Sequence, residues 1–413
     1  MKTAFVTALA TFFGLSQCVV AFASLPTYSG AAQGAAQAYH RGHTHVNPSL
    51  RARSDHHEKR TVDEWVDEVT AMSATRKVTL QFSPSRWHLW SRFKGTVVQK
   101  TWKSVLFLTV FNAVLCFKVH IFRDLIPTFR MQMEMLDKLW HMQMTLTTFI
   151  LAFFLNKSYT VWTDMLSLGR RIQGRLNDVS IMVSTHAKRD ENGLVLPKAQ
   201  IVIDTIARYK RLFCITFYAS VVKTHAPLTT DEALAGFERK GLITADERAL
   251  LAAMPPRTRH HAICQWLGNV VVQACEDDSV FYQRANLHFS FLDKMTQLRA
   301  TYGSVPDKID DRLNMAYAHF VQLLVDSFLI VTPFAALADM GNLSVFATAV
   351  LTMFFQGLLD LSKMFLDPYN NEGQGDNGDY LVVNTLIQET NAGSERFKDL
   401  TKRFPPSYWR GVG

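Results

Sequence analysis

Residues 313–340 read LNMAYAHFVQLLVDSFLIVTPFAALADM, and residues 343–366 read LSVFATAVLTMFFQGLLDLSKMFL. Each run could cross the hydrocarbon core of a bilayer, which takes roughly 20 apolar residues. Directly afterwards come Phe365-Leu366-Asp367-Pro368-Tyr369 and the acidic, glycine-rich segment NNEGQGDNGD at 370–379. A membrane helix that leads straight into a loop of carboxylates and turn residues indicates a channel or transporter with a cation site at the membrane edge.

Two further apolar runs lie earlier in the chain. The first is preceded by Trp87, Trp90 and Trp102 among basic residues, which is typical of anchors at a membrane interface. The second is expected to continue as a helix through 164–183. Period-2 alternation is almost absent, so we predict an all-α fold. The expected membrane helices are about 104–122, 139–162, 313–340 and 343–366, and the apolar but charge-bearing segment 201–222 belongs to a soluble helical bundle.

Composition limits the class of protein. The chain has 413 residues, of which 48% are hydrophobic, with 44 Lys and Arg against 36 Asp and Glu. These values favour a few membrane spans with a substantial aqueous part, and basic loops that flank the spans. The sequence shows no glycine-rich phosphate loop and no basic–aromatic nucleic-acid module, so nucleic-acid binding is not expected. Cys116, Cys214, Cys264 and Cys275 lack the spacing of a zinc site or disulfide framework, so we expect free thiols.

The N-terminus has the pattern of a targeting segment. Residues 1–24 form a signal peptide in outline, with an apolar core and small residues around Phe22. Residues 25–77 are transit-like, with a basic stretch that has no acid before Asp55, and are expected to be disordered. This arrangement resembles the bipartite leaders of algae with secondary plastids and predicts a thylakoid membrane. The alternative is a plasma-membrane, secreted or other endomembrane protein.

Two helix starts are visible as capping boxes, in which a Thr side chain and a Glu three residues later satisfy each other's backbone amides. Thr61 with Glu64 predicts a short amphipathic helix, and Thr244 with Glu247 heads the second of a pair of helices between 228 and 253.

Four segments together resemble the bestrophins, especially the plastid and bacterial members. They are Phe93-Lys94-Gly95-Thr96-Val97, the helix 143–162, Gly241-Leu242-Ile243-Thr244-Ala245-Asp246-Glu247, and Phe365-Leu366-Asp367-Pro368-Tyr369 with its acidic loop. The resemblance implies a channel domain over 78–397, followed by a tail at 398–413. It further implies four membrane helices per subunit, a homopentamer around a central pore, and conduction of chloride, often with bicarbonate or nitrate.

The resemblance assigns the pore neck to Thr145, Phe149 and Phe153, which recur every four residues and so lie along one side of a helix. Taken alone, the spacing is equally that of a core or lipid-facing stripe. Lys157, one turn further on, is either a basic ring in the pore or a lysine that reaches the membrane border. Arg170 and Arg171 either extend the basic lining or pair with acids. A second constriction is expected near Tyr282–Leu287.

The resemblance also implies a calcium clasp, with Asp367, Asp376 and Asp379 as acids and backbone carbonyls of 79–82 completing the site. Calcium prefers six to eight oxygen ligands. The loop has fewer acidic residues here than in the family, so weak calcium binding, constitutive calcium binding and a plain solvated turn all stay open.

Three other classes of function would leave different patterns in the sequence. A secondary transporter would show inverted repeats and broken helices, but no repeat is found and only Pro333 interrupts a span. An enzyme would need a nucleophile–base pair or a metal cluster, and none stands out, so we predict no enzymatic activity. A non-conducting membrane scaffold remains open. Asn112, Asp326 and Asp360 lie within spans, which predicts that some assembly shields them from lipid.

Overall fold

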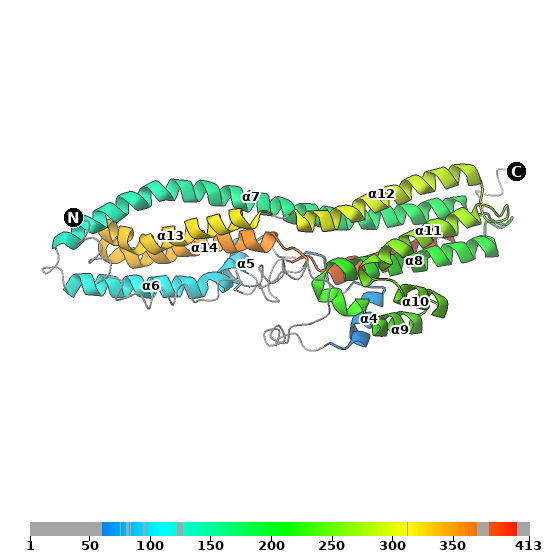
Figure 1. Cartoon of the computed structure of the whole chain (residues 1–413), viewed down its shortest axis with the longest axis horizontal. Helices are drawn as coiled ribbons and strands as arrows, with labels where there is room; N and C mark the ends of the chain where they lie inside the picture. The colour runs from blue at the N-terminus through cyan, green and yellow to red at the C-terminus, as the bar shows by residue number, and fades with distance from the viewer. Residues whose placement is uncertain are drawn as a thin grey trace. The chain divides into compact units, whose positions relative to one another are not determined.

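The computed structural model describes residues 60–402, except 75, 80–81, 83, 94–95, 122–126, 312 and 370–379. The described residues form helices joined by short connections, with two isolated β-bridges and no strand among them. The predicted all-α class is therefore confirmed. Figure 1 shows two helical bundles, with the long helix α7 running through both.

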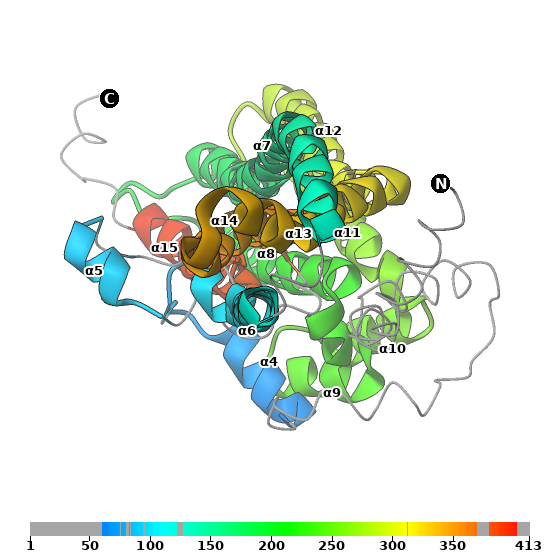
Figure 2. The same cartoon turned by 90° about the vertical axis from the view of Figure 1, so that its left-hand side faces the viewer.

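The first bundle, called the membrane bundle below, contains the apolar runs of the sequence. It consists of α6 (Val97–Ile121), the first half of α7 (Pro127–His186), α13 (Met315–Met340) and α14 (Ser344–Phe365), with the 3-10 turn η5 (Gly341–Leu343) between the last two. Figure 2 looks along this bundle and shows these four helices grouped together. Their shared core includes Leu108, Leu151, Phe154, Val325, Phe328 and Leu359.

By length and hydropathy, two stretches of the described chain qualify as membrane spans, 97–119 and 315–365. The second contains both α13 and α14. The first half of α7 packs in the same bundle, but polar Gln143, Thr145 and Thr147 lower its hydropathy.

The second half of α7 belongs to the second bundle, called the soluble bundle below. At 60 residues, α7 is about 90 Å long, three times the thickness of the hydrocarbon core. Its C-terminal part packs with α8 (Pro197–Val221), α12 (Arg284–Asp310) and α15 (Val383–Thr401), while α11 (Arg259–Ala274) lies against α8 and α12. The segment around 201–222 is thus a buried helix of the soluble bundle, as predicted.

Smaller helices complete this bundle. They are α4 (Val62–Thr70), η3 (Lys223–Thr229), α9 (Asp231–Arg239), α10 (Ala245–Ala252) and η4 (Pro256–Thr258). A further short helix, α5 (Arg86–Ser91), precedes α6 in the chain. Both predicted capping boxes are present, at the starts of α4 and α10. The three described thiols of the soluble bundle, Cys214, Cys264 and Cys275, are buried and free, and Cys116 is also free.

Helix α4 corrects one expectation about the leader. It lies inside the 25–77 segment, yet Val66 and Val69 are buried in the core of the soluble bundle. The side chain of Asn391 in α15 donates to the carbonyl of Val69 over 2.7 Å. Residues 62–70 are therefore folded, because their apolar side and their terminal carbonyls both find partners. The signal peptide and residues 25–59 lie outside the described residues.

Helices α6 and α14 approach closely enough to need a glycine. A Cβ added at Gly357 would lie 2.5 Å from Cγ1 of Val97. A buried hydrogen bond joins the same helices, where Nδ2 of Asn112 donates to Oγ1 of Thr348 over 2.8 Å. Asn112 is fully buried. The expectation that an assembly shields it is therefore corrected, since its own chain does so.

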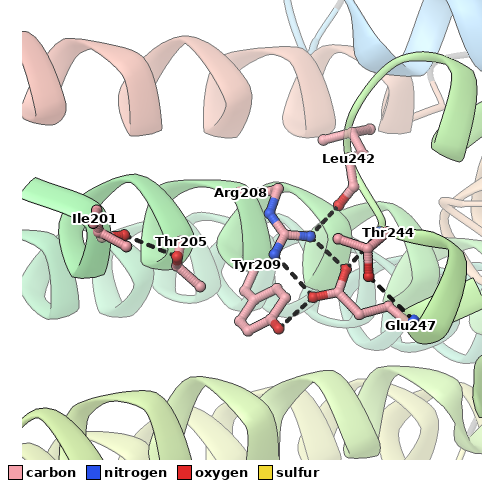
Figure 3. Close-up of polar contacts among 7 residues, drawn as sticks. All are labelled: Ile201, Thr205, Arg208, Tyr209, Leu242, Thr244 and Glu247. Carbon is pink, nitrogen blue, oxygen red and sulfur yellow. Dashed lines mark hydrogen bonds and ion pairs between the residues drawn. The ribbon is translucent and has the colours of Figure 1, made fainter.

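Figure 3 shows the polar contact that fixes α10 on α8. Arg208 donates to both carboxylate oxygens of Glu247, one of them over 2.8 Å, and to the carbonyl of Leu242. The hydroxyl of Tyr209 donates to the same carboxylate. Burial alone would raise the pKa of Glu247, but the hydrogen bonds from Arg208 and Tyr209 outweigh it and hold the pKa below its usual value.

A buried histidine joins η3 to α15. Nε2 of His225 lies 2.5 Å from Oδ1 of Asn384, and its ring packs against Trp65 of α4 at 5.2 Å. Burial lowers the pKa of His225 to about 4. The folded bundle therefore holds this imidazole neutral.

We predict that Glu247→Ala destabilises the soluble bundle by about 2–4 kcal/mol, because it leaves Arg208 buried without its partner and removes the capping box. Asp246→Ala, which removes an exposed acid from the same helical turn, is the control and should cost less than about 1 kcal/mol. The measurement is denaturant unfolding of the purified protein in micelles, followed by tryptophan fluorescence. Equal losses for the two variants would contradict the prediction.

The depressed pKa of His225 also predicts a pH dependence. Between about pH 6.5, where an unfolded histidine titrates, and pH 4, the unfolded chain takes up a proton that the folded chain does not, so stability falls as pH falls. His225→Gln should flatten unfolding free energy against pH in this window, with His319→Gln as control. Some slope should remain, because burial also lowers the pKa of His260, to about 3. An unchanged slope in His225→Gln would refute the assignment.

Candidate functional site

Helix α7 has two unlike sides within the membrane bundle. Leu151, Phe154 and Ser158 face inward and are buried against the other helices of this bundle. On the outward side, the side chain of Phe149 is 72% exposed and that of Phe153 is 58% exposed. In a single chain, these two large rings are therefore largely uncovered on the outer surface of this bundle.

Specific contacts set the rotation of α7 about its axis. Nε1 of Trp140 donates to Oγ1 of Thr332 over 2.9 Å, and the Trp140 ring stacks on Phe328 with centroids 5.3 Å apart. One turn on, Nε2 of Gln143 reaches the carbonyl of Leu324 and, at 2.5 Å, the hydroxyl of Ser327. Because these polar groups bind α13, the opposite side of α7 must point away from it.

The sequence-predicted neck residues lie on this outward side. Thr145 and Lys157 are exposed, like Phe149 and Phe153. Each four-residue step turns about 40° around a straight helix, so Thr145 and Phe153 are about 80° apart and Lys157 lies at the edge of the same side. We call these four residues the α7 row.

The structure decides between the two readings of Arg170. Its guanidinium pairs with Glu389 of α15 and donates to Oε1 of Gln173 over 2.9 Å. Nε of Arg171 donates to Ser167 on its own helix over 3.2 Å. Arg170 is therefore a structural ion pair of the soluble bundle.

The expected second constriction is only partly at the surface. Leu287 is fully buried in the soluble core, so it cannot line a pore, whereas Tyr282 is about one-third exposed at 37%. Sequence reasoning missed Phe289 of α12, which is 76% exposed. A helical projection starting at residue 284 would have separated Phe289 from the buried Leu287.

The two ends of the acidic loop are fixed to the rest of the chain. The hydroxyl of Tyr369 donates to the carbonyl of Met165 in α7 over 3.1 Å. The amide of Leu381 donates to the carbonyl of Pro368 over 2.8 Å, and that of Val382 to the carbonyl of Val78 over 2.9 Å. Val78, which precedes the 79–82 carbonyls of the calcium prediction, is therefore held beside Val382, which follows the loop.

Of the three acids predicted to bind calcium, only Asp367 lies within the described residues. Asp367 follows α14 and is partly buried. Asp376 and Asp379 lie outside the described residues.

Charged groups inside the membrane bundle are bridged by amides of the same chain. Nζ of Lys363 donates to Oε1 of Gln322, whose Nε2 donates to Asp326 over 2.7 Å. Gln356 donates to Asp360 over 3.0 Å. Neither acid is exposed, so the chain itself provides part of the shielding that was expected from an assembly.

With this geometry in place, comparison with known proteins identifies the family. Residues 71–391 match the family model described as bestrophin, RFP-TM, chloride channel. The chain belongs to the bestrophin family. This is a family of chloride channels, and a channel function agrees with the prediction that the chain is not an enzyme.

Solved structures agree with the family. Two mutant forms of a bacterial bestrophin homologue from Klebsiella pneumoniae are similar to this chain, each with a TM-score of 0.55, at 15% and 14% identity. Each match covers 71% of this chain, with 97% and 98% of the other. A further structure, described as a membrane protein, matches with a TM-score of 0.56 at 16% identity, covering 73% of this chain and 99% of that one. At this identity the likeness establishes the bestrophin fold alone. Comparison with curated proteins finds no match.

Proposed function

We propose that this bestrophin is the subunit of a homopentameric anion channel in which the α7 row lines the pore. Phe149 and Phe153 form a hydrophobic neck, Thr145 adds a polar third level, and Lys157 follows as a basic ring. The permeant ions are chloride and bicarbonate.

The observation that carries this proposal is the exposed side of α7. A membrane helix that faced lipid could keep Phe149 and Phe153, but Lys157 on such a side costs about 3 kcal/mol at the helix centre, less where it reaches the border. Arranging several copies around an axis removes this cost, since the same side then faces water. The edges of phenyl rings carry positive charge and tolerate a passing anion, and a narrow apolar ring can gate by losing its water.

The described membrane helices favour a channel over a secondary transporter. Transporter sites usually lie between the halves of a discontinuous helix. Here α13 continues through Pro333 without a break, and α6 and α14 are also unbroken.

Two further parts of the proposal concern regulation and location. We propose that the loop with Asp367, Asp376 and Asp379 binds calcium just after the C-terminal end of α14. The position of Val78 beside Val382, which follows the loop, supports this proposal. The targeting pattern of residues 1–59 supports a thylakoid membrane, where chloride flux would balance proton-driven charge and bicarbonate flux would supply carbon fixation.

The neck is tested by recording anion current from the purified full chain in planar bilayers. We expect a chloride current in the wild type that rises several-fold in Phe149→Ala, because a smaller side chain widens the ring and makes it easier to wet. Phe117→Ala, which removes a similarly exposed ring from α6, should leave the current unchanged. A folded but silent wild type, with and without calcium, would instead favour a scaffold.

The basic ring is tested by selectivity. Lys157→Gln should reduce the preference for chloride over potassium, seen as a shift of the reversal potential toward zero in a salt gradient, because the ring of positive charge is lost. The effect should shrink at high ionic strength, since salt screens exposed charges. Lys118→Gln on α6 is the matched control. An identical reversal potential in both variants would place Lys157 outside the pore.

A further inference from the structure

Three potential metal ligands meet at the end of the membrane bundle away from the soluble bundle. Asp137 and His141 are four residues apart on α7 and so lie on the same side of that helix. Asp339 comes from the last turn of α13, the helix that packs against α7. One ligand atom from each of the three residues lies within 4.8 Å of the other two. Figure 1 shows the beginning of α7 and the end of α13 at the same end of the bundle.

The helix places two of the ligand atoms close together. Nδ1 of His141 is 3.1 Å from Oδ1 of Asp137 and 3.0 Å from the main-chain oxygen of the same residue. That carboxylate oxygen, Oδ1, is buried from water, and its close neighbour is the imidazole, with which it pairs when His141 is protonated but makes no hydrogen bond of good geometry. A metal ion between this oxygen and the imidazole nitrogen would give both atoms a direct ligand bond.

The distances suit a small dication. Two ligand atoms, each about 2.0–2.2 Å from a tetrahedral zinc ion, are about 3.3–3.6 Å apart. The Asp137 and His141 atoms are already this close. Asp339 is exposed at the end of its helix, so its carboxylate can close the remaining gap by a change of side-chain rotamer.

The ligand types select the kind of ion. Imidazole nitrogen with two carboxylates suits zinc and similar transition metals, whereas calcium prefers six to eight oxygens. Three protein ligands leave a fourth position for water. The ion would take the place of the imidazole proton, which leaves to solvent.

The position is next to the α7 row, because His141 stands one turn before Thr145. We propose that Asp137, His141 and Asp339 bind a zinc-type dication at the mouth of the pore, where the ion joins α7 to α13. Its charge raises the local concentration of anions at the mouth. The metal site stands on its own geometry, while its effect on current rests on the proposed pore.

The first test measures zinc binding to the full chain in micelles by calorimetry. His141→Ala and Asp339→Asn change exposed residues, so both variants should fold as the wild type does. Each should lose one tight site per chain, or bind zinc there at least about ten-fold more weakly. His319→Ala, which removes an exposed histidine on α13 that is not part of this group, should bind as the wild type does. The N-terminal histidines contribute equally to all variants. Identical binding in the wild type and both site variants would overturn the proposal.

The second test adds zinc, at low ionic strength, to the side of the bilayer that holds this end of the bundle. The wild-type chloride current should increase, and His141→Ala should not respond. Zinc binding that leaves a measurable current unchanged would overturn the placement at the pore mouth. A channel that conducts under no condition would count against the proposed function instead, with the binding result unaffected.

Discussion

The fold depends on α7 burying one side in each of the two bundles. In the membrane bundle this side packs on α13 and α14, and in the soluble bundle it packs on α12 and α15. The contacts of Trp140 and Gln143 with α13 fix the rotation of the helix, and the Tyr369 hydroxyl fixes it again at Met165. Because the helix is continuous, its outward side is determined by what its inward side binds.

The two bundles solve the problem of buried polar groups differently. In the membrane bundle, the amide of Gln322 bridges Lys363 and Asp326, and the amide of Gln356 donates to Asp360. In the soluble bundle, Arg208 and Glu247 form a direct ion pair. Lys210 is a different case: it is fully buried, its Nζ donates to the Ser180 hydroxyl, and burial lowers its pKa to about 7. A neutral amine is the form that this environment favours.

Local patterns predicted much of this structure because they depend on near neighbours. The capping boxes at Thr61 and Thr244 need only three residues of context, and both are present. The charge-bearing helix after 201 was correctly placed in the soluble bundle, because a span would not carry Arg208, Lys210 and Arg211. Where partners are distant, the sequence left alternatives open, as for Arg170, or gave the wrong partner, as for the shielding of Asn112. Nothing near Asn112 or Arg170 in the chain indicates Thr348 or Glu389.

The sequence by itself determined the all-α class, the apolar runs and the four segments that mark a bestrophin, since hydrophobic periodicity and family motifs are written in consecutive residues. It also placed Thr145, Phe149 and Phe153 along one helix. Only the tertiary structure decided that this side of α7 is left exposed, that Leu287 is buried, and that Asp339 lies beside Asp137 and His141. The reason is that exposure and ligand geometry depend on which helix packs against which, and the packing of α13 on α7 joins residues almost two hundred positions apart.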